Sequence, residues 1–162
     1  MGIIEANLLV FIAYNISFLI SLFKQDVANI VKKIILMLSY SVIGCYNAVI
    51  SLIIELVNEY IKSKIIKFLL VVITIIIGIF MYKNIISILP FIAVLLIIID
   101  TKNKLVSNLL LISSNIMWMI YDYNCMLYLK FIILIYVVGY EILNIVTRKV
   151  RYEGIKKSKS SK

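Results

Sequence analysis

Seven apolar runs follow one another along the chain, separated by short groups of charged or turn-forming residues. The chain is 64% hydrophobic and only 15% charged, whereas a soluble domain is roughly 45–50% apolar and about 25% charged. A soluble fold of this length has too little interior to bury such an excess and too few polar residues to cover it. Lipid accepts an apolar surface, so we expect an all-α membrane protein in which residues 1–147 form one transmembrane domain.

We interpret the apolar runs as membrane-crossing helices, because one crossing needs about 20 apolar residues, with a range of roughly 17–25. Their predicted ranges are 6–23, 31–46, 48–61, 68–82, 85–99, 105–121 and 126–146. The second and third runs are short, so a six-helix arrangement is the alternative. The segment Met1–Ala6 contains no Lys or Arg. It therefore lacks the basic start of a secretory signal peptide, and we expect the first run to remain as a helix.

The uneven distribution of basic residues predicts the orientation. With seven helices and the N-terminus outside, fifteen Lys and Arg residues lie on the inner side, against Lys83 and Lys130 on the outer side. Cytoplasmic loops carry such an excess, which predicts a multi-pass membrane protein with a cytoplasmic C-terminus. The net charge of +9 is then explained by contact with anionic lipid head groups on the cytoplasmic side. Nucleic acid is not expected as a partner, because the basic residues are spread over short loops.

The segment 148–162 differs from the rest of the chain in composition. It is basic and rich in serine, and such segments cannot bury enough apolar surface to offset the entropy of ordering. We expect it to be a disordered cytoplasmic tail.

Three short matches indicate an internal repeat. Residues 9–13 resemble residues 89–93, residues 39–41 can be set beside 113–115, and residues 55–58 resemble 141–144. Parallel repeats are a known transporter architecture. We therefore expect a three-plus-one-plus-three arrangement, in which residues 6–64 and 85–147 form two three-helix bundles and residues 66–83 form a linker helix between them.

The second half also resembles a known family. Its Ile88-Leu89-Pro90 helix start, Trp118 before a polar helix end, and Asn144 before a basic residue are similar to the pattern of the YgjV-type bacterial inner-membrane proteins. That family is itself similar to the SWEET and PQ-loop transporters, which use paired three-helix bundles. The resemblance implies a SWEET-like carrier that moves a small polar solute by alternating access. A non-transporting membrane scaffold or regulatory partner protein is the alternative.

Polar residues within the expected helices are the candidates for a site. Asn58 and Asn144 lie in the matching segments of the two halves. Buried amides either join helices by hydrogen bonds or contact a solute. We predict that both asparagines, together with Asn115 and Trp118, bind the solute. For the stretch that includes Ser113, Ser114 and Asn115, close helix packing is the alternative, and Trp118 could instead anchor its helix at the membrane interface.

Glu55 and Glu141 are the second pair of candidates. An ionised carboxylate deep in a bilayer costs about 2.5–3.5 kcal/mol, so it has a partner or a function. We predict that these two residues couple charge or protons to transport. The alternative is that they are neutral, or pair with cytoplasmic lysines and set the depth of their helices.

Pro90 is the only proline of the chain, and it has two interpretations. At the start of the helix predicted over 85–99 a proline breaks no hydrogen bond, so it could simply begin the helix. In the carrier interpretation it is a hinge.

Enzymatic and cofactor chemistry find little support in the sequence. The chain contains no His and two Cys residues, so we expect no catalytic Cys–His site, no bound metal and no haem. The two cysteines, Cys45 and Cys125, fall at helix ends on the expected outer face. They are either inert thiols or a disulfide.

Overall fold

The structure, a computed structural model, describes residues 2–99 and 103–160, with side-chain burial described up to residue 147. Within these residues the chain is all-α, as predicted, and forms seven helices. They are α1 (Gly2–Ser21), α2 (Gln25–Val42), α3 (Tyr46–Tyr60), α4 (Lys64–Phe80), α5 (Ile85–Ile98), α6 (Lys104–Asn124) and α7 (Tyr128–Ser160).

Three of these helices are long and apolar enough to cross a membrane: α1, α6 and the segment Tyr128–Thr147 of α7. Large apolar side chains on them face outward, with exposed fractions of 66% for Phe18, 50% for Leu109 and 65% for Leu143. A contiguous surface of this kind indicates contact with lipid or with another protein. The helix α5 has 14 residues, so at about 1.5 Å per residue it is shorter than a hydrocarbon core of roughly 30 Å.

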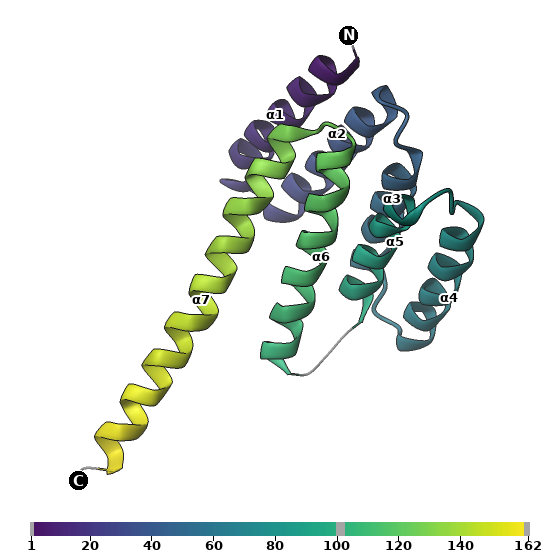
Figure 1. Ribbon diagram of the computed structural model, residues 1–162. Coiled ribbons are helices and arrows are strands. Elements are labelled where there is room, and N and C mark those ends of the chain that lie inside the picture. Colours follow the sequence, from purple (N-terminus) through teal and green to yellow (C-terminus); the bar gives the residue numbers. More distant parts are fainter. Residues whose placement is uncertain (1, 100–102, 161–162) are drawn as a thin grey trace.

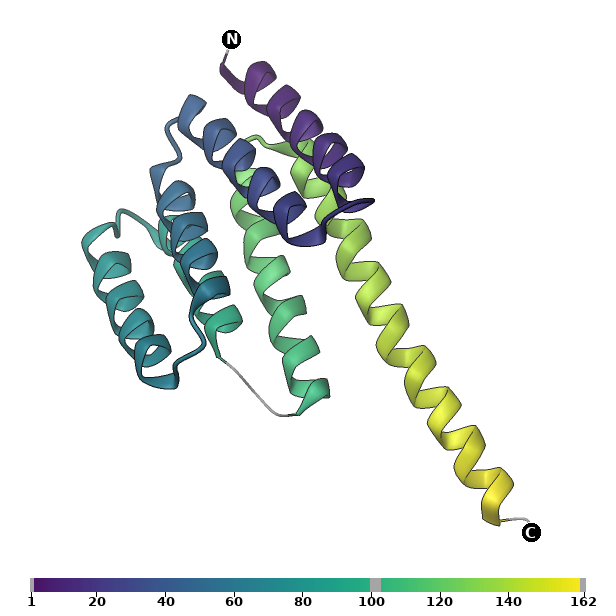
Figure 2. The same cartoon turned by 180° about the vertical axis from the view of Figure 1, so that it is seen from behind.

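Successive helices run in opposite directions. The N-terminus and the α2–α3, α4–α5 and α6–α7 turns therefore belong to one end of the bundle, and the α1–α2 and α3–α4 turns and the C-terminus belong to the other. In Figure 1 the N-terminus and the α2–α3 and α6–α7 turns are uppermost, the α3–α4 turn and the C-terminus are lower, and the α1–α2 and α4–α5 turns lie at about the same middle height. The view from behind in Figure 2 shows the same arrangement. Following the distribution of basic residues, we call the end with the N-terminus the outer end and the other the inner end.

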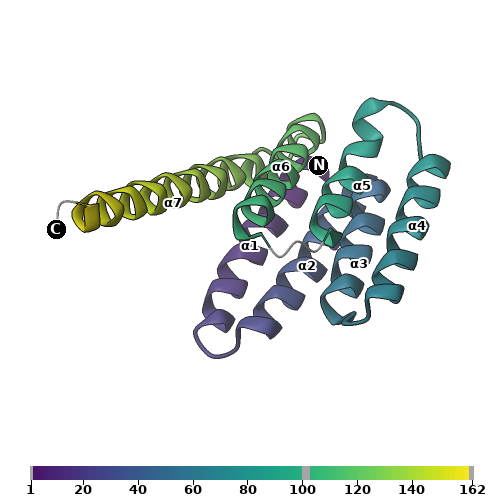
Figure 3. The ribbon, with the colours of Figure 1, turned by 90° about the horizontal axis from the view of Figure 1, so that it is seen from below.

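Helices that are neighbours in the sequence pack together, and two further contacts join helices that are not neighbours in the sequence. The helix α1 packs along α2, α5 packs along α6, and α6 packs along α7, while α3 contacts α5 and α1 contacts α7. The helix α4 lies at the edge, against α3 and α5, and the inner part of α7 projects away from the other helices (Figure 3). At that edge Gly78 of α4 packs against the Phe91 side chain of α5.

The observed boundaries differ most from the predicted ones in two places. The helix α2 begins at Gln25, six residues before the predicted range, so Lys32 and Lys33 lie inside it. The helix α7 continues to Ser160, where we had expected a disordered tail from Arg148. Lys and Arg are good helix formers and the segment contains no proline, so nothing in it stops a helix that is already formed.

Pro90 is buried inside α5, five residues after the first residue of that helix, Ile85. The prediction that it stands where a proline breaks no hydrogen bond is therefore wrong. A residue at this position would donate its N–H to the carbonyl of Ile86, and proline has no N–H to donate. The helix lacks one backbone hydrogen bond at this point, which is compatible with the predicted hinge.

The α2–α3 and α6–α7 turns have the same backbone structure. In the first, the N–H of Cys45 donates to the carbonyl of Tyr40 over 2.9 Å, and in the second, Leu127 donates to Asp122 over 2.9 Å. These six-to-one bonds define a Schellman motif, in which the residue before the donor adopts a left-handed conformation. That residue is Gly44 in the first turn, with φ of 73°, and Met126 in the second, with φ of 60°.

Exchanging residue types at these two positions should change stability in opposite directions. Gly44→Ala should destabilise the protein by about 1 kcal/mol or more, and Met126→Gly should stabilise it by about 1 kcal/mol, because a side chain is strained at positive φ. Thermal unfolding of the detergent-purified protein measures both effects. Gly139→Ala is the control: this glycine has open space around it within α7, so alanine there should be neutral or slightly stabilising. Equal effects of the two alanine variants would contradict the assignment.

Candidate functional site

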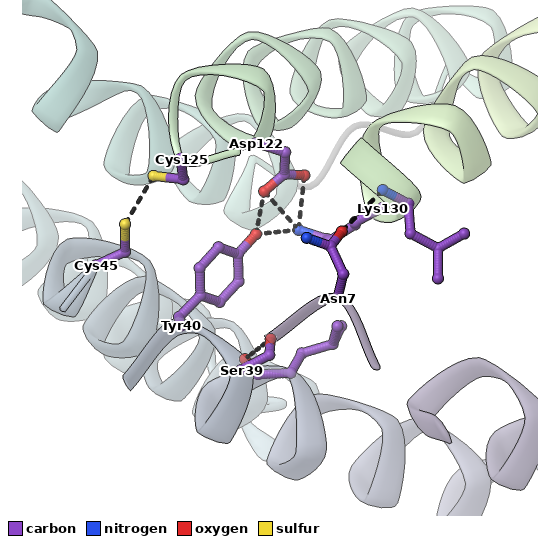
Figure 4. Close-up of polar contacts among 9 residues, drawn as sticks. Asn7, Ser39, Tyr40, Cys45, Asp122, Cys125 and Lys130 are labelled. Carbon is purple, nitrogen blue, oxygen red and sulfur yellow. Dashed lines mark hydrogen bonds and ion pairs between the residues drawn. The ribbon is translucent and has the colours of Figure 1, made fainter. Parts of the chain in front are cut away.

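A buried ion pair with a bridging hydroxyl joins α2, α6 and α7 near the outer end. The Nζ atom of Lys130 lies 3.0 Å from Oδ2 of Asp122, off the direction of a hydrogen bond, and the two side chains are 6% and 0% exposed. The hydroxyl of Tyr40 donates to Oδ1 of Asp122 and accepts from Nζ of Lys130, as the dashed lines in Figure 4 show. We call these three residues the outer cluster. Each charge is matched, which is the condition for keeping charges buried.

Aromatic rings surround the amine of the outer cluster. Nζ of Lys130 lies 4.2 Å from the ring centroid of Trp118 and 4.9 Å from that of Tyr40. The ring of Tyr121 lies 6.2 Å from both of these rings. The faces of aromatic rings attract cations, and more strongly where water is excluded. Trp118 is 5% exposed, so in the structure it packs on Lys130 and does not anchor α6 at the membrane interface.

Backbone geometry explains how the three side chains of the outer cluster come together. Tyr40 and Asp122 occupy the same position in the two Schellman motifs, as the acceptors of the six-to-one bonds. Asn7 of α1 then fixes the start of α7: its Nδ2 donates to the Met126 carbonyl over 3.0 Å, and its Oδ1 accepts from the Leu129 N–H over 3.1 Å. The residue after Leu129 is Lys130, which is thereby held against α2 and α6.

A second group of charges joins α2 to α3 nearer the inner end. Nζ of Lys33 lies 2.9 Å from Oε1 of Glu55 and 2.6 Å from Oε1 of Glu59. The side chains of Lys33 and Glu55 are 7% and 17% exposed, and that of Glu59 is 40% exposed. Glu55 thus has the lysine partner that its depth in the helix requires. That lysine lies inside α2, not in a cytoplasmic loop.

A cavity of about 200 Å³ lies between these two groups of charges. Water occupies about 30 Å³ per molecule in the liquid, so the space is large enough for a small solute of a few heavy atoms. We call it the central cavity. Its lining residues come from six helices: Tyr14, Lys32, Lys33, Leu36, Leu52, Glu55, Ile97, Leu111, Asn115, Trp118, Lys130, Leu134 and Val137.

One cation in the wall of the central cavity has no counter-charge in contact. Lys33 is paired with two carboxylates and Lys130 with one, whereas Lys32 makes no ion pair among the described residues. The Nζ atom of Lys32 lies 5.7 Å from the centroid of the Tyr14 ring. An anionic group in the cavity would find an available partner in Lys32.

The structure brings together some of the residues predicted for the site and separates others. Glu55, Asn115 and Trp118 line the central cavity. Glu141 and Asn144 line a different pocket of about 430 Å³, between α6 and α7 at the inner end, together with Lys104 and Asn108. Asn58 lies outside both sets of lining residues. Its Oδ1 and the Oε2 of Glu141 are buried without a hydrogen-bond partner among the described residues.

The outer cluster was not predicted from the sequence. The distribution of basic residues places Lys130 on the outer side, and no predicted site includes Asp122, which follows the helix predicted over 105–121. The structure shows both side chains buried instead. The sequence signal for this pair is its spacing, because Asp122 precedes the α6–α7 turn and Lys130 follows it. When α7 runs antiparallel to α6 after this turn, the two opposite charges lie at the same depth.

Comparison of the chain with protein-family models, with curated proteins and with solved structures gave no match. Within the described residues, no three His, Cys, Asp or Glu side chains lie close enough to hold a metal ion.

Removing one charge of the outer cluster should cost more than removing both. Asp122→Asn or Lys130→Met alone should destabilise the protein by about 3–5 kcal/mol, because the remaining charge stays buried without its partner. The Asp122→Asn, Lys130→Met double variant should recover most of that loss. Thermal unfolding of the purified protein gives the three values. Losses that simply add in the double variant would show that the two side chains do not interact.

Proposed function

We propose that the chain is a multi-pass bacterial inner-membrane carrier that moves a small polar solute by alternating access between two three-helix halves, α1–α3 and α5–α7, with α4 as the linker. The observation that carries this proposal is the central cavity, which lies between the two halves and draws charged and polar side chains from both. In the same position a protein that only needed to be stable would gain more from apolar packing.

The lining of the central cavity supports an internal repeat, in a register that differs from the matches of residues 39–41 with 113–115 and of residues 55–58 with 141–144. The first residue of α3 is Tyr46 and that of α7 is Tyr128, which is 82 residues later. The last residues of α2 and α6, Val42 and Asn124, are also 82 residues apart. Each residue of α2 and α3 is therefore equivalent to the residue 82 positions later. In this register four pairs of equivalent positions all line the cavity, as expected for a space on a pseudo-twofold axis. They are Lys33 and Asn115, Leu36 and Trp118, Leu52 and Leu134, and Glu55 and Val137. Glu141 then lies one helical turn further along its helix than the position equivalent to Glu55.

The contacts between helices support the same relationship. Exchanging the two halves converts the α1–α7 contact into the α5–α3 contact, and both are present. The exchange also relates two hydrogen-bonded contacts. Asn7 bonds the backbone of Leu129, and Asn47, the position equivalent to Leu129, donates to the carbonyl of Ser87 over 2.8 Å. Ser87 corresponds to Asn7 in the match of residues 9–13 with residues 89–93.

The position of the outer cluster implies which side of the carrier is closed. Tyr40 belongs to the first half, whereas Asp122 and Lys130 belong to the second, so their contacts hold the outer ends of the halves together. The central cavity lies on the inner side of this cluster. On the inner side, the carboxylate of Glu59 is partly exposed and contacts Lys33 in the cavity wall. We therefore take this state to be closed toward the outside, and opening outward to require separation of Tyr40 from Asp122.

The charges around the central cavity favour an anionic solute. Of the charged residues that line it, three are lysines and one is Glu55. Lys32 is the one without an ion pair among the described residues, so a carboxylate or phosphate group of the solute would gain a charge-assisted contact there. Asn115 and the indole of Trp118 complete a wall that could orient the rest of such a molecule.

Thermal unfolding against a panel of small organic acids, amino acids, sugars and nucleosides tests the proposal. A ligand present at 100 times its dissociation constant stabilises by about 2.7 kcal/mol, and we expect such a shift from an organic acid. The shift should disappear in Lys32→Gln. It should persist in Lys24→Gln, which removes an exposed lysine at the α1–α2 turn, away from the cavity. The Asn58→Ala, Asn144→Ala double variant decides whether those two residues also contact solute.

Uptake of the stabilising solute into proteoliposomes then distinguishes a carrier from a scaffold. Saturable uptake that Lys32→Gln abolishes is expected from a carrier. The scaffold interpretation is favoured by the length of α7, which projects beyond the other helices at its inner end (Figure 1). Absence of any shift and any uptake across the whole panel would favour that alternative.

Pro90→Ala tests the hinge. Alanine supplies the N–H that the carbonyl of Ile86 lacks, so α5 should become straighter and more stable. We expect a higher unfolding temperature and slower uptake, with unchanged solute affinity in the thermal assay. A faster or unchanged uptake rate would exclude Pro90 as a hinge.

A further inference from the structure

The two cysteines meet across the outer ends of the two halves. Cys45 precedes α3 in the first half, and Cys125 follows α6 in the second. Their Sγ atoms lie 2.7 Å apart while both are free thiols, compared with about 2.0 Å between bonded sulfurs. Figure 4 shows this contact beside the outer cluster, which joins the same two halves. Almost no movement of the backbone is needed to bond them.

The thiols are reachable from the outer end. Both cysteines line a surface pocket of about 290 Å³ that lies between the α2–α3 turn, the α4–α5 turn and the end of α6. Its walls include Asn84, Lys83 and Asn124, which are exposed. A reagent on the outer side of the membrane can therefore approach the sulfurs without entering the central cavity.

One of the two thiols is activated by its surroundings. The hydrogen bond with Cys125 lowers the pKa of Cys45 to about 7, with a further contribution from the hydroxyl of Tyr121 and against the effect of burial. The same contact raises the pKa of Cys125. The thiolate is the reactive form of cysteine, so at neutral pH Cys45 is the nucleophile of the pair.

We propose that Cys45 and Cys125 form a reversible disulfide that fixes the outer ends of the two halves to each other and holds the outer cluster closed. The oxidant is a disulfide of the outer compartment, either a small molecule or an oxidoreductase. The Cys45 thiolate attacks one of its sulfurs, forms a mixed disulfide and releases one thiol. Cys125 then loses its proton and attacks the Cys45 sulfur, which releases the second thiol. Two electrons pass to the external disulfide, and the two cysteines lose two protons.

The bond would act directly on the contacts that must separate for outward opening. Tyr40 lies five residues before Cys45, and Asp122 lies three residues before Cys125. A disulfide at the turns therefore joins the same two helix ends as the hydrogen bond between Tyr40 and Asp122, about one helical turn away from it. In this respect the inference deepens the proposed carrier function, because it makes the outer closure dependent on the redox state outside.

The bond itself is tested on the purified full-length protein, with oxidised glutathione as the oxidant and dithiothreitol as the reductant. After denaturation, a polymer-linked maleimide should label two thiols in the reduced protein and none in the oxidised protein. In Cys45→Ser and Cys125→Ser the remaining cysteine should form only a mixed disulfide with glutathione, which mass spectrometry detects. Oxidation of the wild type should slow at pH values below about 7, as the Cys45 thiolate is lost. Two labelled thiols after oxidation would overturn the proposal.

The closing effect is tested by acylation of lysines with a membrane-impermeant reagent and mass spectrometry. Lys130 is 4% exposed and also lines the central cavity, so the reagent is added only to the outside of right-side-out proteoliposomes. From that side it can reach Lys130 only when the outer ends separate. Oxidation should reduce its labelling at least about tenfold, and reduction should restore it. Lys83, which is exposed in the same outer pocket, is the control and should react equally in both states. Equal labelling of Lys130 in both redox states, whether high or low, would overturn the closing effect.

These measurements do not depend on transport, so the carrier proposal and the disulfide proposal can be contradicted independently of each other. A disulfide that protects Lys130 in a protein without uptake would contradict the carrier alone. Uptake that is unaffected by oxidation, in a protein whose disulfide has formed, would contradict the closing effect alone. The Cys45→Ser, Cys125→Ser double variant should show the same uptake before and after oxidation.

Discussion

The ion pair between Asp122 and Lys130, bridged by the hydroxyl of Tyr40, is the constraint on which the rest of the arrangement depends. In an apolar environment a charge without a partner is very costly, so three side chains from three helices must stay in contact. These contacts hold α2, α6 and α7 against one another near the outer end and so determine where the three helices cross. The helices α1 and α5 then pack along α2 and α6, respectively.

The same constraint explains why there is a cavity further inside. The outer cluster draws the outer ends of α2 and α6 together, while Lys33 turns toward Glu55 and Glu59 on α3. Between them the wall carries Asn115 and Lys32, which are long or polar side chains that do not pack to the density of an apolar core. A space with polar walls remains, and its one cation without an ion pair among the described residues gives it a preference for negative charge.

The sequence was sufficient for the class and number of the helices, because apolar runs broken by charges leave few other interpretations. Three of the residues predicted for a site, Glu55, Asn115 and Trp118, line the central cavity, since polar side chains in apolar helices turn toward the protein interior. The spacing of Asp122 and Lys130 around one turn makes their contact possible, but whether they meet depends on the angle at which α7 returns along α6. The start of α2 was missed because the polar residues Gln25 and Asp26 look like a loop, whereas they form the first turn of the helix.

The equivalence of Tyr40 and Asp122 in the two turns has a consequence for how such a protein can arise. In a symmetric dimer of a single three-helix unit, the residue at this position would face its own copy. Two aspartates would repel each other, and two tyrosines would leave Lys130 and its symmetry mate without a carboxylate. A donor and an acceptor can stand opposite each other only when the two halves differ in sequence. In the proposed two-half architecture, joining the halves in one chain, with α4 as the linker between them, allows that difference to be encoded.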